Sequence, residues 1–281
     1  MSMNNLPGGW RIDLEFEPNR IQRLMAMLSS DQQVLAMRGQ YQEVAFDPRS
    51  VMRVEQQGPV GSCQGQSLSS EGEWVYIVAT GDITLQFSRA MGYYETQRLD
   101  GLSGDVGSTI EGGVRLIKTI GLCRESLWPY QTRYDNRRPA NWQEVLADAE
   151  NYKIATATRL LSYDAIRTFL GSGQGGVHLG ITWNSSVDSE VVESYATNGG
   201  GGHSVGLYAL SERKDRAGRP YCWMMNSWGK SWQGDGWAEW SPRAIEQMLA
   251  ARWSVFVGLS DMPNVKPRTY TLEQLKKDLR V

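Results

Sequence analysis

The chain carries the stretch QGPVGSC at residues 57–63, and after it apolar residues recur at roughly helical spacing, at Leu68, Val75 and Val78. This pattern places Cys63 directly after a tight turn, at or near the start of a helix. Backbone N–H groups at a helix N-terminus favour an anion, so we expect a reactive thiolate at neutral pH. A lone cysteine is more often a small buried apolar residue, so this assignment depends on partners elsewhere in the chain.

Two candidate partners follow Cys63 along the chain. His203 comes after four glycines and opens an apolar run, a setting in which a loop can bring an imidazole to the mouth of a cleft. Asn226 ends another apolar run, where its amide can hold that imidazole and the indole of Trp228 can shield it from water. The only other histidine, His178, stands inside an apolar strand and is expected to pack there.

The predicted elements divide the chain into a helical half and a β half. The run Ser108-Thr109-Ile110-Glu111 has the form of a capping box and predicts a helix that ends near Gly121. Short β-branched and aromatic runs separated by Gly, Asn, Asp and Arg predict strands of an antiparallel sheet or barrel. An α+β fold with a cleft between the halves is therefore expected. The expected helices are 63–79, 108–121, 142–149 and 162–171, with a short helical pattern at 21–28 and a short helix signalled by Thr271 and Gln274. The expected strands are 177–183, 204–210, 221–228, 236–240 and 254–259.

The composition of the 281-residue chain excludes several classes of protein. With 41% hydrophobic residues, it has enough apolar material for one large domain or two lobes. The net charge of -2 gives no basic surface for nucleic acid, and no apolar run approaches the roughly 20 residues that span a bilayer. Residues 1–10 lack the pattern of a secretion signal, so a cytoplasmic location is expected, with association with a virus particle as the alternative.

The three cysteines are too few for a dense disulfide framework, which fits a reducing compartment. Cys123 and Cys222 lack a neighbouring histidine or basic cluster, so buried structural roles are expected for both. Three cysteines and two histidines never approach the paired spacing of a structural metal site. We therefore expect neither a metal nor another cofactor.

Three separate motifs occur in one order along the chain: residues 57–63, Gly-Gly-His at 201–203, and NSWG at 226–229 with Gly234 to Trp237 after it. Together they resemble the papain family of cysteine peptidases, which implies a two-lobed fold with a helical left lobe, an antiparallel β-barrel-like right lobe and the active-site cleft between them. Further segments are similar to the bacterial, archaeal and viral branch of that family. These are GW-x-x-DL at 9–14, Tyr93-Tyr94, and GSTIEGGVRLIKTIGLCRESLWPY at 107–130.

The resemblance implies catalytic roles for four residues. Cys63 would attack the scissile carbonyl, and His203 would first take and then donate a proton while Asn226 holds its ring. The Gln57 side chain and the Cys63 backbone N–H would form the oxyanion hole, with donors aimed at the charge of the tetrahedral intermediate.

The resemblance also implies four residues around the bound peptide. Gly107, Ser108 and Gly202 would line the cleft, where an extended peptide pairs with the backbone. Trp228 would cover the contact between the histidine and the asparagine. The implied domain plan is an N-terminal extension at 1–45, a peptidase domain at 46–261 with its lobes dividing near residue 150, and a C-terminal tail at 262–281.

Several residues depart from the family pattern. Val60 stands where many relatives have a disulfide cysteine, and Gln64 and Gln66 stand where aromatic residues are common. The long inhibitory prosegment of secreted relatives is not recognisable in residues 1–45.

Two function classes therefore stay open. The first is a peptidase that acts on a peptide or protein substrate, with an acyl transferase as a variant of the same chemistry. The second is a weakly active scaffold or binding module, such as a component of a viral particle, that docks a partner through either extension. Retention of all four catalytic residue types favours the enzyme.

Overall fold

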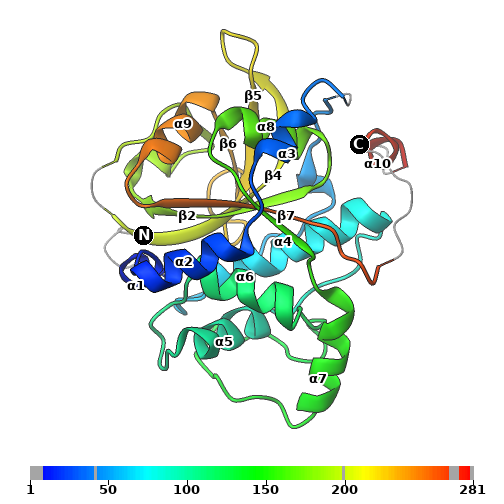
Figure 1. Ribbon diagram of the computed structural model, residues 1–281, viewed down its shortest axis with the longest axis vertical. Helices are drawn as coiled ribbons and strands as arrows, with labels where there is room; N and C mark the ends of the chain where they lie inside the picture. Colours follow the sequence, from blue (N-terminus) through cyan, green and yellow to red (C-terminus); the bar gives the residue numbers. More distant parts are fainter. Residues whose placement is uncertain (1–8, 41–42, 198–199, 266–271, 279–281) are drawn as a thin grey trace.

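The computed structural model describes residues 9–40, 43–197, 200–265 and 272–278, and has two lobes (Figure 1). One lobe is helical and the other is built on a sheet, as the α+β prediction requires. The helical lobe contains α4 (Cys63–Thr80), α5 (Arg89–Asp100), α6 (Ile110–Thr119) and α7 (Trp142–Ala149). Helix α4 runs along the junction and packs against both α5 and the sheet.

The second lobe is a seven-stranded sheet with the order β1-β7-β2-β4-β5-β6-β3. All pairs are antiparallel except β3 with β6, and the described strands form an open sheet rather than a closed barrel. Helices α8 (Tyr163–Gly171) and α9 (Pro242–Ala250) contact this sheet. The strands are β1 (Thr156–Arg159), β2 (Gly175–Trp183), β3 (Val191–Val192), β4 (Gly201–Lys214), β5 (Pro220–Met225), β6 (Trp237–Trp240) and β7 (Ser254–Ser260).

Glycines allow the central helix to approach its neighbours closely. A Cβ atom at Gly65 of α4 would lie 2.5 Å from the backbone nitrogen of Tyr93 in α5. A Cβ atom at Gly92 of α5 would lie 2.8 Å from the carbonyl oxygen of Gly65. The two backbones therefore meet directly, and this contact fixes the start of α4, where Cys63 lies, against α5.

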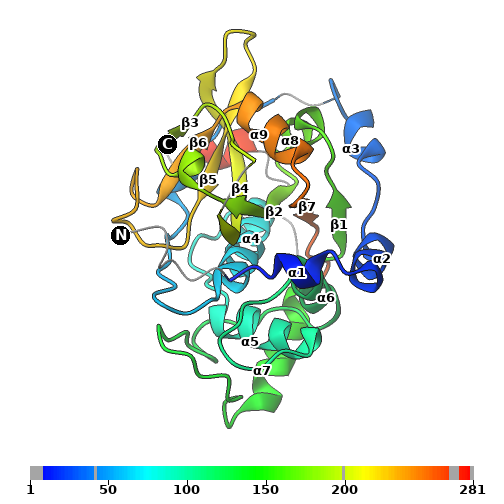
Figure 2. The ribbon, with the colours of Figure 1, turned by 90° about the vertical axis from the view of Figure 1, so that its left-hand side faces the viewer.

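Residues outside the two lobes pack on their surface. Helices α1 (Ile12–Glu15), α2 (Pro18–Met27) and α3 (Gln32–Ala36) precede the helical lobe, and α10 (Leu272–Asp278) follows the last strand. Figure 2 shows α1 at the junction between the sheet and the helices α5 and α6. Among the described helices, none combines the length and apolarity needed to cross a bilayer.

Most predicted elements are confirmed, with local differences. The helix predicted after Ser108 is α6, but its N-cap is Thr109, whose hydroxyl accepts a hydrogen bond from the N–H of Gly112. Ser108 instead donates its hydroxyl to Gln64. Helices α1, α3, α5 and α9 and strands β1 and β3 were not predicted. Short 3-10 helices occur at Pro48–Ser50, Glu150–Tyr152 and Ser185–Val187.

Candidate active site

Cys63 is the first residue of α4, directly after the turn that the sequence predicted. Gly58 takes a φ of +63° in that turn, a conformation that a glycine adopts without strain. The thiol is fully buried, and the backbone N–H of Ser204 in β4 points at its Sγ atom from 3.4 Å. The start of α4 therefore faces the start of β4 across the junction of the lobes.

His203 and Asn226 lie side by side because β4 pairs with β5. The histidine Nε2 donates to the Oδ1 atom of Asn226 over 2.9 Å, and the backbone N–H of Ser227 donates to the same oxygen over 2.8 Å. Two donors on Oδ1 fix which way the amide points. Among the described residues, the other histidine nitrogen, Nδ1, has no hydrogen-bond partner, so it can accept a proton.

Tryptophans enclose the histidine ring. The ring centroid of Trp228 lies 4.6 Å from that of His203, and that of Trp183 lies 4.8 Å away, nearly perpendicular. Trp232 packs against both indoles. The structure therefore places Trp228 where the sequence predicted a shield, and adds two aromatic residues to it.

Gln57 is fully buried and is held at both ends. Its side-chain nitrogen donates to the carbonyl oxygen of Val60 over 2.9 Å, and its side-chain oxygen accepts from the Ser227 hydroxyl over 2.6 Å. These bonds tie Gln57 to the turn before Cys63 and to the residue after Asn226. The second N–H of the amide is not used in these contacts.

The cleft between the lobes is occupied by the chain's own N-terminal segment, which we define as Gly9–Glu15. The Ser108 N–H donates to the Gly9 carbonyl over 2.9 Å, and the Arg11 N–H donates to the Ser108 carbonyl over 3.0 Å. On the other wall, the Trp10 N–H points at the Gly202 carbonyl from 3.4 Å. Two of the residues predicted to bind substrate thus bind this segment.

Gly9 lies directly against Cys63. A Cβ atom at Gly9 would come within 2.9 Å of Cys63 Sγ and 2.2 Å of the Gly61 carbonyl oxygen, so only glycine fits at this point. A Cβ atom at Gly107 would lie 2.5 Å from the carbonyl oxygen of Gly9. That oxygen accepts the Ser108 N–H. The segment therefore covers Cys63 and is held by the opposite wall of the site.

Trp10 and Glu15 anchor the segment. The Trp10 ring lies over Gly180 of β2, where a Cβ atom would come within 2.6 Å of the indole. The indole N–H donates to Glu15 Oε2 over 3.0 Å. The same carboxyl accepts from the backbone N–H groups of Ile110 and Glu111, at 2.5 and 3.0 Å, so it satisfies two donors at the start of α6.

Burial decides the charge of Cys63 and His203 while the segment covers them. Burial raises the pKa of the Cys63 thiol to about 11, although the N–H groups of Ser204 and Gly9 oppose the shift. Burial also lowers the pKa of His203 to about 4, against the effect of its bond to Asn226. Both groups are therefore neutral near pH 7, and the thiolate expected from the helix N-terminus alone is wrong for the closed state.

Comparison with known proteins shows to which family this chain belongs. A model of the papain family of cysteine proteases matches residues 43–252. The chain belongs to this family. As a member of this family, it is a thiol protease. A comparison with curated protein sequences found no significant match.

Solved structures of cysteine proteases share its papain-like fold. Xylellain from Xylella fastidiosa has 20% sequence identity and a TM-score of 0.70, with 91% of this chain and 97% of xylellain covered. The ragweed pollen allergen Amb a 11 in its proform has 19% identity and a TM-score of 0.61, covering 78% of this chain and 65% of the allergen. Bromelain from Ananas comosus in complex with the E64 inhibitor has 14% identity and a TM-score of 0.56, covering 78% and 99%.

The glutamines that depart from the pattern of papain-like proteases both have polar contacts. Gln64 accepts the Ser108 hydroxyl over 2.8 Å and lies over Gly113, which leaves room for the amide. Gln66 donates its side-chain nitrogen to the Ser62 hydroxyl over 3.3 Å. The polar start of α4 is thus part of the bonding around Cys63.

The remaining candidate residues of this protease lie away from the catalytic pair. His178 is fully buried in β2 and bonds to the Ser67 hydroxyl through Nδ1 at 3.0 Å. Cys123 and Cys222 are buried free thiols, and burial raises the pKa of Cys123 to about 12.

Sequence reasoning missed the residues that close the site. Trp10 belongs to the motif GW-x-x-DL at 9–14, but nothing local indicates that this motif lies in the cleft. Glu15 is one acidic residue of a polar extension and carries no local signal of its role. Trp183 carried a weak signal, since it ends an apolar strand next to the predicted histidine strand.

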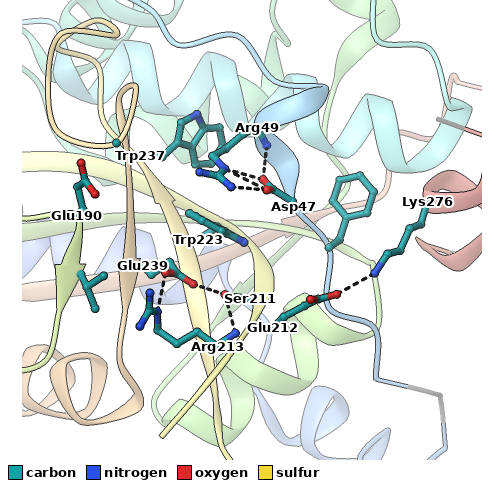
Figure 3. A pocket seen from close by; sticks show the side chains of 13 residues that line it. Asp47, Arg49, Glu190, Ser211, Glu212, Arg213, Trp223, Trp237, Glu239 and Lys276 are labelled. Atoms are coloured by element: carbon teal, nitrogen blue, oxygen red, sulfur yellow. Dashed lines mark hydrogen bonds and ion pairs between the residues drawn. The ribbon is translucent and has the colours of Figure 1, made fainter. Parts of the chain in front are cut away.

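A further hollow, of about 670 Å³, is lined by residues 211–213, which lie at the opposite end of β4 from His203. Figure 3 shows the side chains that line it. The Arg49 guanidinium lies 4.3 Å from the centroid of the Trp223 ring inside it. Three ion pairs join its walls: Arg49 with Asp47, Arg213 with Glu239, and Lys276 with Glu212. Since these cations are paired within the hollow and no predicted site residue lines it, we assign it no role in catalysis.

Proposed function

We propose that this chain hydrolyses peptide bonds through a thioester on Cys63, and that its own N-terminal segment keeps it closed until the segment leaves the cleft. The proposal rests on the hydrogen bond between His203 and Asn226, which lies beside Cys63 at the start of α4. This arrangement leaves one imidazole nitrogen free to exchange a proton with the thiol.

The proposed reaction follows from the positions of these groups. Cys63 Sγ attacks the scissile carbonyl carbon, and His203 takes the thiol proton and passes it to the leaving amine. A water molecule then attacks the thioester, gives a proton to His203, and releases the acid as the thiol reforms. Gln57 and the Cys63 backbone N–H donate to the oxyanion in both steps.

The N-terminal segment supplies the regulation in this proposal. It covers the thiol, uses the backbone groups of Ser108 and Gly202, and pairs with Ser108 in parallel through Trp10. After release, solvent reaches the catalytic pair and the penalty that keeps both groups neutral is relieved, so the thiolate and imidazolium can form. The ragweed allergen was solved in a proform, which is consistent with a closed state in this family.

We also propose that the chain belongs to the bacterial, archaeal and viral branch of the family. The motif at 9–14 and the block at 107–130 support this placement, because the structure brings both segments to the cleft. Xylellain is matched over nearly its whole length, which is consistent with it.

Labelling with the E64 inhibitor tests the function. We expect a mass increase localised to Cys63, slow in the full chain because the thiol is covered, and absent in Cys63→Ala. Hydrolysis of fluorogenic peptides should likewise be slow in the full chain and absent in Cys63→Ala. If a variant with a weakened segment, Glu15→Ala, neither reacts with E64 nor cleaves peptides although Cys63 has become accessible to iodoacetamide, the chain is a scaffold rather than a peptidase.

A further inference from the structure

A small cavity lies between Asn226 and the unusual glutamine at position 66. Its volume is about 10 Å³, which is the space that one water molecule requires. Its lining includes Gln66, Ser70, Tyr208 and Asn226, each at most 2% exposed. The cavity is therefore narrow and largely polar, and it borders the asparagine that holds His203.

The two amides present complementary atoms that have no partner among the described residues. These are the Nδ2 donor of Asn226 and the Oε1 acceptor of Gln66. Leaving a buried polar atom unsatisfied is unfavourable. The two atoms are not in direct contact, since a bond between them would satisfy both.

The hydrogen bonds around the cavity fix the orientation of both amides. Asn226 Oδ1 accepts from His203 and from the Ser227 backbone, so Nδ2 is the free end. On the other side, the Tyr130 hydroxyl donates to the Gln57 carbonyl and so accepts from the Ser62 hydroxyl.

Since the Ser62 proton is used on Tyr130, Ser62 accepts from Gln66 Nε2, and Oε1 of Gln66 is its free end. The residues that carry the free donor and the free acceptor therefore line the same water-sized space. Ser70 and Tyr208, which carry hydroxyls, line it as well, and an internal water usually has about three polar partners.

We propose that Gln66 is a positioning residue for the catalytic site, which acts on Asn226 through one buried water molecule. The water accepts from Asn226 Nδ2 and donates to Gln66 Oε1. It thereby holds the amide plane that orients His203, and it connects Asn226 to the Ser62 turn in front of Cys63. The inference rests on the proposed function, because it assigns Gln66 to the same reaction.

A double-mutant cycle on peptide hydrolysis tests the proposal. Gln66→Met keeps the volume of the side chain and removes its polar atoms. We expect it to lower kcat about tenfold with little change in KM, within the range for groups that share one hydrogen-bond network. In the Asn226→Ala background the same substitution should have almost no further effect.

Ser62→Ala supplies the matched cycle, because it removes the other contact of Gln66 and leaves the water site intact. The effect of Gln66→Met should persist in that background. An equal loss in the Asn226→Ala background, or a loss that disappears with Ser62→Ala, would overturn the proposal in favour of a role in the turn.

A crystal structure of the unmodified chain at high resolution gives a test that needs no variant. It should show one water within hydrogen-bond distance of Asn226 Nδ2 and Gln66 Oε1. A space that holds no water, or that side-chain atoms occupy, would refute the inference. If no peptide is hydrolysed, the proposed function fails, and the same cycle is then measured by alkylation of Cys63.

Discussion

Replacing Glu15 with alanine should open the active site. The Glu15 carboxyl accepts three hydrogen bonds, from the Trp10 indole and from the backbone N–H groups of Ile110 and Glu111. At about 1 kcal/mol net for each bond, its removal weakens the closed state by about 3 kcal/mol. Since about 1.4 kcal/mol is a factor of ten, the open fraction should rise about a hundredfold.

Alkylation of Cys63 by iodoacetamide at pH 7, followed by peptide mass mapping, measures the open fraction. Glu15→Ala should react about a hundredfold faster than the unmodified chain. Glu17→Ala is the matched control, because that side chain is 53% exposed and has only a 3.7 Å contact with Arg20. Cys123 and Cys222 are buried elsewhere and report on unfolding.

Two outcomes would refute this reasoning. Equal rates in Glu15→Ala and the unmodified chain would mean that Glu15 does not hold the segment. Equal acceleration of all three cysteines would mean that the substitution unfolds the protein instead of opening the cleft.

The same carboxyl gives the closed state a pH dependence. Burial raises the pKa of Glu15 to about 7, from an ordinary value of 4.5. The closed state therefore binds this proton more tightly, and the resulting stability is fully present below about pH 4.5 and is lost as the pH rises through about 7. The alkylation rate of Cys63 in the unmodified chain is divided by the rate in Glu15→Gln, so that the ionisation of Cys63 cancels. This ratio should rise between pH 6 and pH 8, and a ratio that does not change with pH would contradict the assignment.

Three further substitutions test the site and the core. Cys63→Ala should abolish turnover with little change in Tm, and residual activity near that of the unmodified protein would refute the nucleophile. Gln57→Ala should lower kcat by about 10² to 10³ with little change in KM, the range for one oxyanion donor, and a near-normal kcat in a folded variant would exclude that role. Glu71 is fully buried between Gly176 and Gly206, and burial raises its pKa well above the ordinary value. The Tm of Glu71→Gln relative to the unmodified protein should therefore increase as the pH rises above about 4.5, and a pH-independent difference would count against a buried ionisable Glu71.

Local sequence patterns were enough to predict most elements and the chemistry of the candidate site. Periodic apolar residues predicted α4, α6, α7 and α8 and the main strands. The apolar periodicity of a helix differs from that of a strand, and both depend only on local spacing. Cys63, His203 and Asn226 could be proposed because each stands at an element end with a recognisable neighbourhood. Helix α5 was missed because both faces are buried and it shows no apolar stripe.

Which segment fills the cleft and which charge state the site has could be read only from the folded chain. The contacts of Gly9 with Ser108 and of Glu15 with α6 join distant parts of the chain, and no local pattern specifies such packing. The pKa values of Cys63 and His203 follow from burial, which depends on every element around them. A helix start favours a thiolate, but removal of water by the covering segment outweighs it, and the extent of that removal is a property of the folded molecule.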